Sequence, residues 1–169
     1  DSYQEARRRI GLAPQEANFD RFFPVIDCLI YQGGYFGIDP AESRERALEL
    51  LDMFELTHKK DARPNELSGG EKRRLLIAKA VIHDPDIVIM DEPTASLDVE
   101  LRHTLWDYLE GLKSIGKTMI LTTHYIEEVE ALAERVAIMN DGNLVLEDTI
   151  DDVLETYGRY QCVLDVDGL

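Results

Sequence analysis

The chain has 169 residues, of which 44% are apolar, and its 34 acidic and 18 basic side chains give a formal net charge of −16. This acidity argues against a nucleic-acid-binding protein, which normally presents a basic patch, and the apolar content argues against a disordered chain. The sequence contains no apolar run long enough to span a membrane and no secretory signal at its start. Cys28 and Cys162 lie far apart, and we interpret them as reduced thiols of a cytoplasmic protein.

The first half of the chain predicts a short strand followed by two helices. Arg9–Pro14 has the composition of a strand that ends at a proline, and residues 15–37 form an aromatic-rich stretch without a clear period. Pro40 begins a predicted helix that continues to about Leu56. A second helix is predicted from Ser68 to the segment Asp84–Asp86, where a proline interrupts it.

The second half alternates between strands and helices. The predicted strands are Ile87–Met90, Thr118–Thr123, Val136–Met139 and Asn143–Glu147, and the predicted helices are Val99–Leu112, Tyr125–Glu134 and a last one capped by Thr149 and Asp152. This alternation predicts an α/β fold with a mostly parallel sheet. Acidic residues are concentrated in residues 127–169, which predicts a solvated face or, alternatively, a docking surface for a basic partner.

Two adjacent carboxylates, Asp91 and Glu92, directly follow the strand Ile87–Met90. Ligands of parallel sheets gather at the carboxyl ends of the strands. One carboxylate could bind a magnesium ion on a nucleotide while the other orients and deprotonates a water. The simpler alternative is that two acids end a strand at the surface, but the segment Pro93–Asp98 that follows favours a functional site.

A second candidate site lies at the start of the helix after Leu67. Ser68 and Glu71 have the spacing of a capping box, which explains both residues locally. A capping box does not explain Gly69 and Gly70, because consecutive glycines weaken the first turn of a helix. A helix N-terminus without side chains and with the basic residues 72–74 nearby is typical of an anion site. Alternatively, those basic residues pair with acids of the core.

These segments, taken together, resemble the ATP-binding-cassette (ABC) ATPases. Leu67–Glu71 resembles the signature motif, and Ile87–Glu92 resembles the Walker B strand with its catalytic glutamate. Ser96–Asp98 resembles the D-loop, His124 the switch histidine, and Gln15 the Q-loop glutamine. The motifs occur in the family's order, with Glu71 at a position where glutamine is commoner.

The resemblance implies a P-loop NTPase-like fold with a helical subdomain, ATP and Mg²⁺ as cofactors, and ATP hydrolysis coupled to transport. It implies these roles: catalysis for Glu92 and His124; metal binding for Asp91 and Gln15; and nucleotide binding for Gln15, Ser68, Gly69, Gly70, Glu71 and Asp98.

The resemblance also implies partners and a location. Two such subunits would enclose ATP in a head-to-tail dimer and would act with a separate transmembrane subunit, without binding nucleic acid. The protein would lie in the cytoplasm, peripheral on the inner face of the cell membrane. Arg73–Ala78 and Tyr125–Glu128 are similar to segments of bacterial exporters. The aromatic residues of 19–36 are then either a groove for the transmembrane subunit or the core of the helical subdomain.

The sequence departs from the family in one respect, because no Walker A loop precedes Gln15. The pattern occurs at Gly111–Thr118, but there it follows a predicted helix and begins a strand, the reverse of a phosphate-binding loop. We therefore expect a core whose N-terminal part is absent, an interrupted sheet between the strands at Thr118 and Val136, and an inactive isolated chain.

The expected organisation is a remnant of the core at 1–14, a helical signature subdomain at 15–83, the ATPase core at 84–157 and an extension at 158–169. Two alternatives remain. One is a chromosome-maintenance or DNA-repair ABC ATPase, which the short distance between Gln15 and Leu67 disfavours because those proteins insert a long coiled coil there. The other is a non-catalytic fragment that only binds partners.

Overall fold

The computed structural model describes residues 2–16 and 18–157, which form two compact units divided between His124 and Tyr125. The predicted extension 158–169, including Cys162, lies outside the described residues. Within the first unit the elements are α1 (Ser2–Arg8), β1 (Ile10–Ala13), α2 (Val25–Tyr35), α3 (Pro40–Met53), 3-10 turns at Thr57–Lys59 and Pro64–Glu66, α4 (Gly69–Val81), β2 (Ile87–Asp91), α5 (Val99–Ser114) and β3 (Thr118–Thr122). The second unit contains α6 (Ile126–Leu132), β4 (Arg135–Asn140), β5 (Asn143–Thr149) and α7 (Ile150–Tyr157).

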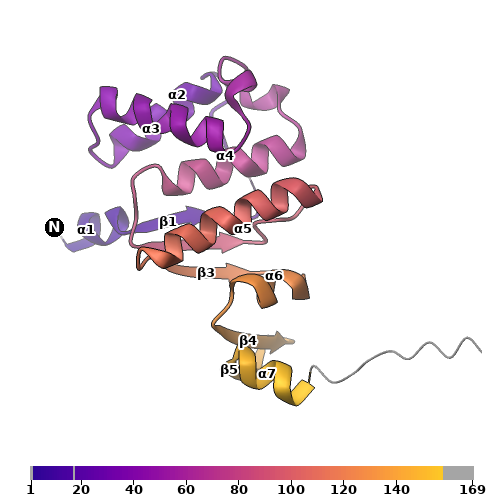
Figure 1. Cartoon of the computed structure of the whole chain (residues 1–169). Coiled ribbons are helices and arrows are strands. Elements are labelled where there is room, and N and C mark those ends of the chain that lie inside the picture. Colours follow the sequence, from indigo (N-terminus) through magenta and orange to yellow (C-terminus); the bar gives the residue numbers. More distant parts are fainter. Residues whose placement is uncertain (1, 17, 158–169) are drawn as a thin grey trace, which may run out of the picture. The chain divides into compact units, whose positions relative to one another are not determined.

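The first unit is built on a parallel three-stranded sheet in the order β1-β2-β3 (Figure 1). In this register Ala13 lies beside Met90, and Asp91 lies beside Thr122. Because all three strands run in the same direction, their carboxyl ends meet at one edge of the sheet. The predicted strands and the parallel pairing are confirmed.

Helix α4 packs against the sheet at Gly11 of β1. A Cβ atom on Gly11 would lie 2.2 Å from the main-chain oxygen of Ala80, so only glycine permits this approach. On the same face Ala13, Val88 and Met90 are buried. On the opposite face Leu12 and Ile120 are 58% and 54% exposed, so the sheet leaves one apolar face open to solvent.

Helices α2 and α3 stack on the far side of α4 (Figure 1). Their core is aliphatic and includes Val25, Leu29 and Leu51, which are fully buried. Helix α2 was not predicted, because Gly33 and Gly34 and the surrounding aromatic residues obscure its helical period.

Helix α3 starts at Pro40 as predicted, with the Asp39 side chain accepting a hydrogen bond from the Ala41 amide. It ends at Met53, a little before the predicted end. Glu55, with a φ of 54°, adopts a left-handed conformation that cannot continue a helix.

The second unit is an antiparallel β4-β5 hairpin with α6 and α7. The turn at Asp141 and Gly142 has φ values of 48° and 77°, which fit the predicted tight hairpin. The Thr149–Asp152 cap is confirmed by a 2.5 Å hydrogen bond from the Thr149 hydroxyl to the Asp152 carboxylate.

Two further features concern the described residues as a whole. Among them β3 pairs only with β2 and β4 only with β5, as the predicted interruption of the sheet requires. None of their helices combines the length and the apolar character that a membrane crossing needs.

The contact at Gly11 leads to a stability prediction. Gly11→Ala should lower the free energy of unfolding by about 2 kcal/mol, because the added methyl group forces α4 away from β1. Gly111→Ala is the control: it lies on α5 with open space around its Cβ position and should raise stability by roughly 0.5 kcal/mol. Urea denaturation followed by circular dichroism measures both, and equal effects would contradict the proposed close packing.

Candidate functional site

The carboxyl end of β2 carries the predicted acidic pair. Asp91 is the last residue of the strand, and Glu92 follows it with a φ of 50°, a left-handed conformation that is costly for a residue with a side chain. The Glu92 amide donates a 2.9 Å hydrogen bond to the main-chain oxygen of Thr122 on β3. The chain therefore leaves the strand sharply at Glu92 while its backbone stays fixed beside β3.

His124 and Glu92 meet at this edge. Nδ1 of His124 lies 3.2 Å from Oε1 of Glu92. The Glu92 side chain is 32% exposed and that of His124 is 60% exposed, so both can reach a solvent molecule. A carboxylate with an adjacent imidazole can accept a proton from a bound water and orient it.

Thr122 links the two acids, a role that the sequence analysis missed. Its hydroxyl donates to Oδ1 of Asp91 and accepts a 3.2 Å hydrogen bond from the Glu92 amide. The signal lay in the strand pairing, which puts Thr122 directly beside Asp91. Without the β2–β3 register, nothing in the sequence distinguishes Thr122 from other threonines at strand ends.

Gln15 lies just beyond the end of β1, on the same edge as Asp91. Gln15 is exposed, and its main-chain oxygen lies 3.4 Å from Nη1 of Arg73. The structure thus brings the backbone of Gln15 to the edge that carries Asp91, Glu92 and His124.

The N-terminus of α4 has the predicted capping box. The Ser68 hydroxyl accepts from the Glu71 amide at 3.2 Å, and a Glu71 carboxylate oxygen accepts from the Ser68 amide at 2.7 Å. This amide, together with the Ser68 hydroxyl and nearby Lys59 and His58, lowers the pKa of Glu71 below its usual value. Glu71 is therefore the charged cap of the helix.

Two glycines leave the first turn of α4 without side chains. A Cβ atom on Gly69 would meet nothing within 4 Å. On Gly70 it would lie 3.1 Å from the main-chain oxygen of Ser96, a residue with a φ of 67°. The turn is open at Gly69 and in close contact with the loop after Glu92 at Gly70.

Asp98 has a clear local role. It is the N-cap of α5, and its side chain accepts a 2.9 Å hydrogen bond from the Leu101 amide. Its part in nucleotide binding stays a prediction.

The Gly111–Thr118 segment is the predicted turn between helix and strand. Gly111 to Ser114 form the last turn of α5, the chain then turns at Gly116 with a φ of 86°, and it enters β3 at Thr118. Nζ of Lys117 lies 2.8 Å from the Asp84 carboxylate. The lysine therefore ties this turn to the loop before β2.

Among the basic residues after the signature, Arg74 pairs with an acidic side chain, as the alternative interpretation expects. Arg74 lies 4.0 Å from the Glu55 carboxylate and donates a 2.6 Å hydrogen bond to the main-chain oxygen of Phe54. His83 stacks on Phe36 with ring centres 3.7 Å apart, and burial lowers the pKa of its imidazole. The two rings meet because the end of α4 lies against α2.

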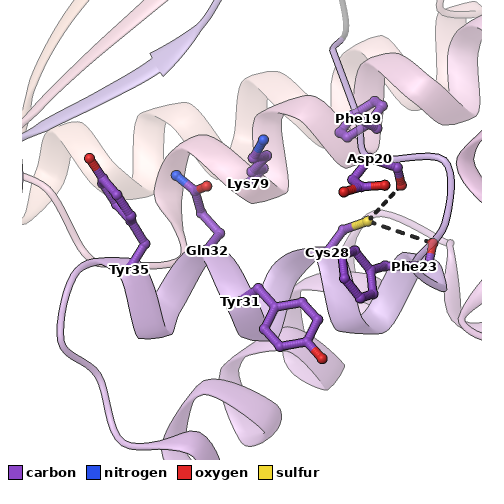
Figure 2. A pocket seen from close by; sticks show the side chains of 8 residues that line it. All are labelled: Phe19, Asp20, Phe23, Cys28, Tyr31, Gln32, Tyr35 and Lys79. Atoms are coloured by element: carbon purple, nitrogen blue, oxygen red, sulfur yellow. Dashed lines mark hydrogen bonds between the residues drawn. The ribbon is translucent and has the colours of Figure 1, made fainter.

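An aromatic groove lies along α2 (Figure 2). It encloses about 440 Å³ and is lined by Phe19, Asp20, Phe23, Cys28, Tyr31, Gln32, Tyr35 and Lys79. Tyr31 and Tyr35 are 57% and 62% exposed, and the rings of Phe23 and Tyr31 make an edge contact at 4.7 Å. The aromatic stretch is thus a surface groove rather than the core of the helical region.

A family model described as "ABC transporter" matches residues 1–95. The chain belongs to the ABC transporter family. Among curated relatives, a "Nod factor export ATP-binding protein I" of Cupriavidus metallidurans is 44% identical, over 91% of this chain and 54% of the relative. A protein of the same name in Paraburkholderia xenovorans is 46% identical, over 84% of this chain and 47% of the relative.

Solved structures agree with the family. A dimeric ATP-binding cassette in a post-hydrolysis state with ADP and Pi has a TM-score of 0.80 and 29% identity, over 88% of this chain and 66% of that chain. An ATP-binding subunit of an ABC transporter has a TM-score of 0.83 and 25% identity, over 94% and 66%. The predicted ABC ATPase fold is confirmed. The chain spans about half the length of the curated relatives it matches.

The charged cap of α4 leads to a pH-dependent prediction. Glu71→Gln should lower the free energy of unfolding at pH 7 by roughly 0.5 kcal/mol, because an anion is favoured at a helix N-terminus. Since the folded-state pKa of Glu71 is lowered, this difference is present above the ordinary value near 4.5 and disappears as the pH falls through the lowered pKa. Urea denaturation at steps from neutral to acidic pH tests this, and a pH-independent difference would be the contrary result.

Proposed function

We propose that this chain is part of an ATP-hydrolysing subunit of an ABC transporter. The observation that carries the proposal is the Glu92–His124 pair beside Asp91, at the carboxyl edge of a parallel sheet. Membership of the ABC transporter family supports the same reaction.

In the proposed reaction the water that attacks the γ-phosphate is oriented by Glu92, which takes up its proton. His124 would donate a hydrogen bond to the γ-phosphate, and its contact with Glu92 would hold that carboxylate beside the phosphate. Thr122 would hold Asp91 and the backbone of Glu92 in place through its hydroxyl. Most of the rate enhancement would come from such positioning and electrostatics, as in other phosphoryl transfers.

Asp91 and Gln15 would bind the magnesium ion. Their side chains offer a carboxylate and an amide oxygen, the hard ligands that Mg²⁺ prefers. Two protein ligands of this kind would suit an ion whose other ligands are phosphates and water. When bound, Mg²⁺ would neutralise negative charge on the phosphates.

The start of α4 would complete the site of a second subunit. Ser68, Gly69, Gly70 and Glu71 leave an open, capped helix N-terminus, which suits a phosphate group. Asp98 would link the two sites across a head-to-tail dimer. A dimeric solved cassette with ADP and Pi supports this arrangement.

The aromatic groove along α2 would receive a transmembrane subunit. It presents exposed rings with one acidic and one basic residue, Asp20 and Lys79, at a site formed by α2, the loop before it and α4. The curated relatives are named as export ATP-binding proteins, which supports an exporter and a position on the inner face of the membrane.

Glu92→Gln tests the reaction in the extended protein, by which we mean this chain expressed with the coding sequence that precedes Asp1. The variant should bind ATP normally but turn it over about 10²-fold more slowly, because the base that activates water is lost. The matched control is Glu110→Gln, an exposed glutamate on α5. Phosphate release and fluorescent-nucleotide binding are the measurements.

Near-normal turnover in Glu92→Gln would remove Glu92 from the proposed role. The 169-residue chain alone should hydrolyse ATP negligibly, because no phosphate-binding loop precedes its Gln15.

Tyr31→Glu tests the groove. The change places a charge among exposed rings and should reduce binding of the extended protein to membrane vesicles from its source cells at least about fivefold, the loss expected for an interface aromatic. Ile115→Glu, at a side chain that is 69% exposed in the turn before β3, is the control. Flotation with these vesicles and with protein-free vesicles of the same lipids separates protein from lipid binding; equal binding of both variants would refute the docking role.

A further inference from the structure

Arg73 is a buried cation at the centre of the first unit. It lies on α4, just after the capping box, and only 6% of the residue is exposed. Burying a guanidinium group is costly unless its donors are well paired. The stability of this buried group therefore depends on the acceptors that its donors bind.

The guanidinium group donates to main-chain oxygens of two segments that are distant in sequence. Nη1 lies 2.7 Å from the oxygen of Pro14 and 3.4 Å from that of Gln15. Nε lies 3.3 Å from the oxygen of Pro93, and Nη2 donates to the main-chain oxygen of Asp91. One planar group thus joins the segment after β1, the end of β2 and the loop after Glu92.

These oxygens belong to, or adjoin, the residues of the proposed site. Gln15 and Asp91 are the proposed metal ligands, and Pro93 directly follows Glu92. A guanidinium group is rigid and planar, so its donors hold their acceptors at fixed spacings, which a lysine cannot do. The spacing between the backbones of Gln15 and Asp91 therefore depends on where α4 holds Arg73.

We propose that Arg73 is a positioning residue that sets the geometry of the magnesium ligands Gln15 and Asp91 and couples it to the signature helix α4. This inference rests on the proposed ATPase function. It assigns to Arg73 a role that acts through the backbone of the proposed metal ligands.

A matched pair of variants tests the proposal in the extended protein. Arg73→Gln should raise the Mg²⁺ concentration for half-maximal ATP turnover about tenfold or more, the usual effect of losing a residue that orients metal ligands. Arg74→Gln is the control, because the neighbouring arginine binds main-chain oxygens of Phe54 and Glu55, outside the site. It should lower thermal stability but leave the Mg²⁺ dependence within about twofold of the unsubstituted protein.

If the Mg²⁺ concentration for half-maximal turnover rises equally in both variants, or in neither, Arg73 does not have the positioning role. If Arg73→Gln does not fold, Arg73→Lys replaces it in the same measurement. The lysine keeps the charge but cannot join both segments in a fixed geometry, so the Mg²⁺ concentration for half-maximal turnover should still rise.

Amide hydrogen exchange keeps this inference distinguishable from the proposed reaction. In the Arg73 variant, peptides that contain Gln15 and Glu92 should exchange faster, whereas in Arg74→Gln the faster exchange should occur near Glu55. An unsubstituted protein without Mg²⁺-dependent turnover would overturn the ATPase proposal. Unchanged exchange at Gln15 and Glu92 would overturn the role of Arg73.

Discussion

The close passage of α4 across β1 is the constraint on which the rest of the first unit depends. The main-chain oxygen of Ala80 lies where a side chain of residue 11 would begin, so the helix and the strand touch through their backbones. Helix α4 is rigid, so the contact of its last turn with Gly11 also restricts the position of its first turn. In that first turn Ser68 caps the helix and Gly70 contacts Ser96. The contact thus places the open helix terminus next to the loop that follows Glu92.

The elements with strong local signals could be predicted from the sequence. The strands β2 and β3 are nearly continuous apolar runs, and the cap of α4 uses residues three positions apart, so both are determined by neighbours in the chain. Helix α2 could not be recognised because Gly33 and Gly34 lower its local helical preference, and packing against α3 and α4 compensates for this.

The sequence predicts the acids and the histidine of the candidate site, but not the residues that hold them in place. Asp91, Glu92 and His124 carry their own chemical signal, whereas Thr122 and Arg73 act through hydrogen bonds to segments distant in sequence. Thr122 reaches Asp91 only because β2 and β3 pair in one register, and Arg73 reaches Pro14 only because α4 crosses β1. Such roles follow from tertiary contacts, which composition and spacing do not encode.

The ion pair between Lys117 and Asp84 affects how variants of this chain should be interpreted. A lysine in the spacing of a phosphate-binding loop is an obvious residue to replace when nucleotide binding is to be abolished. Here the replacement would release the turn before β3 from the loop before β2, by removing an ammonium group 2.8 Å from a carboxylate. Loss of activity in a Lys117 variant would therefore indicate that the pairing of β2 and β3 has been weakened. The contribution of side chains to nucleotide binding would have to be tested with variants at other residues.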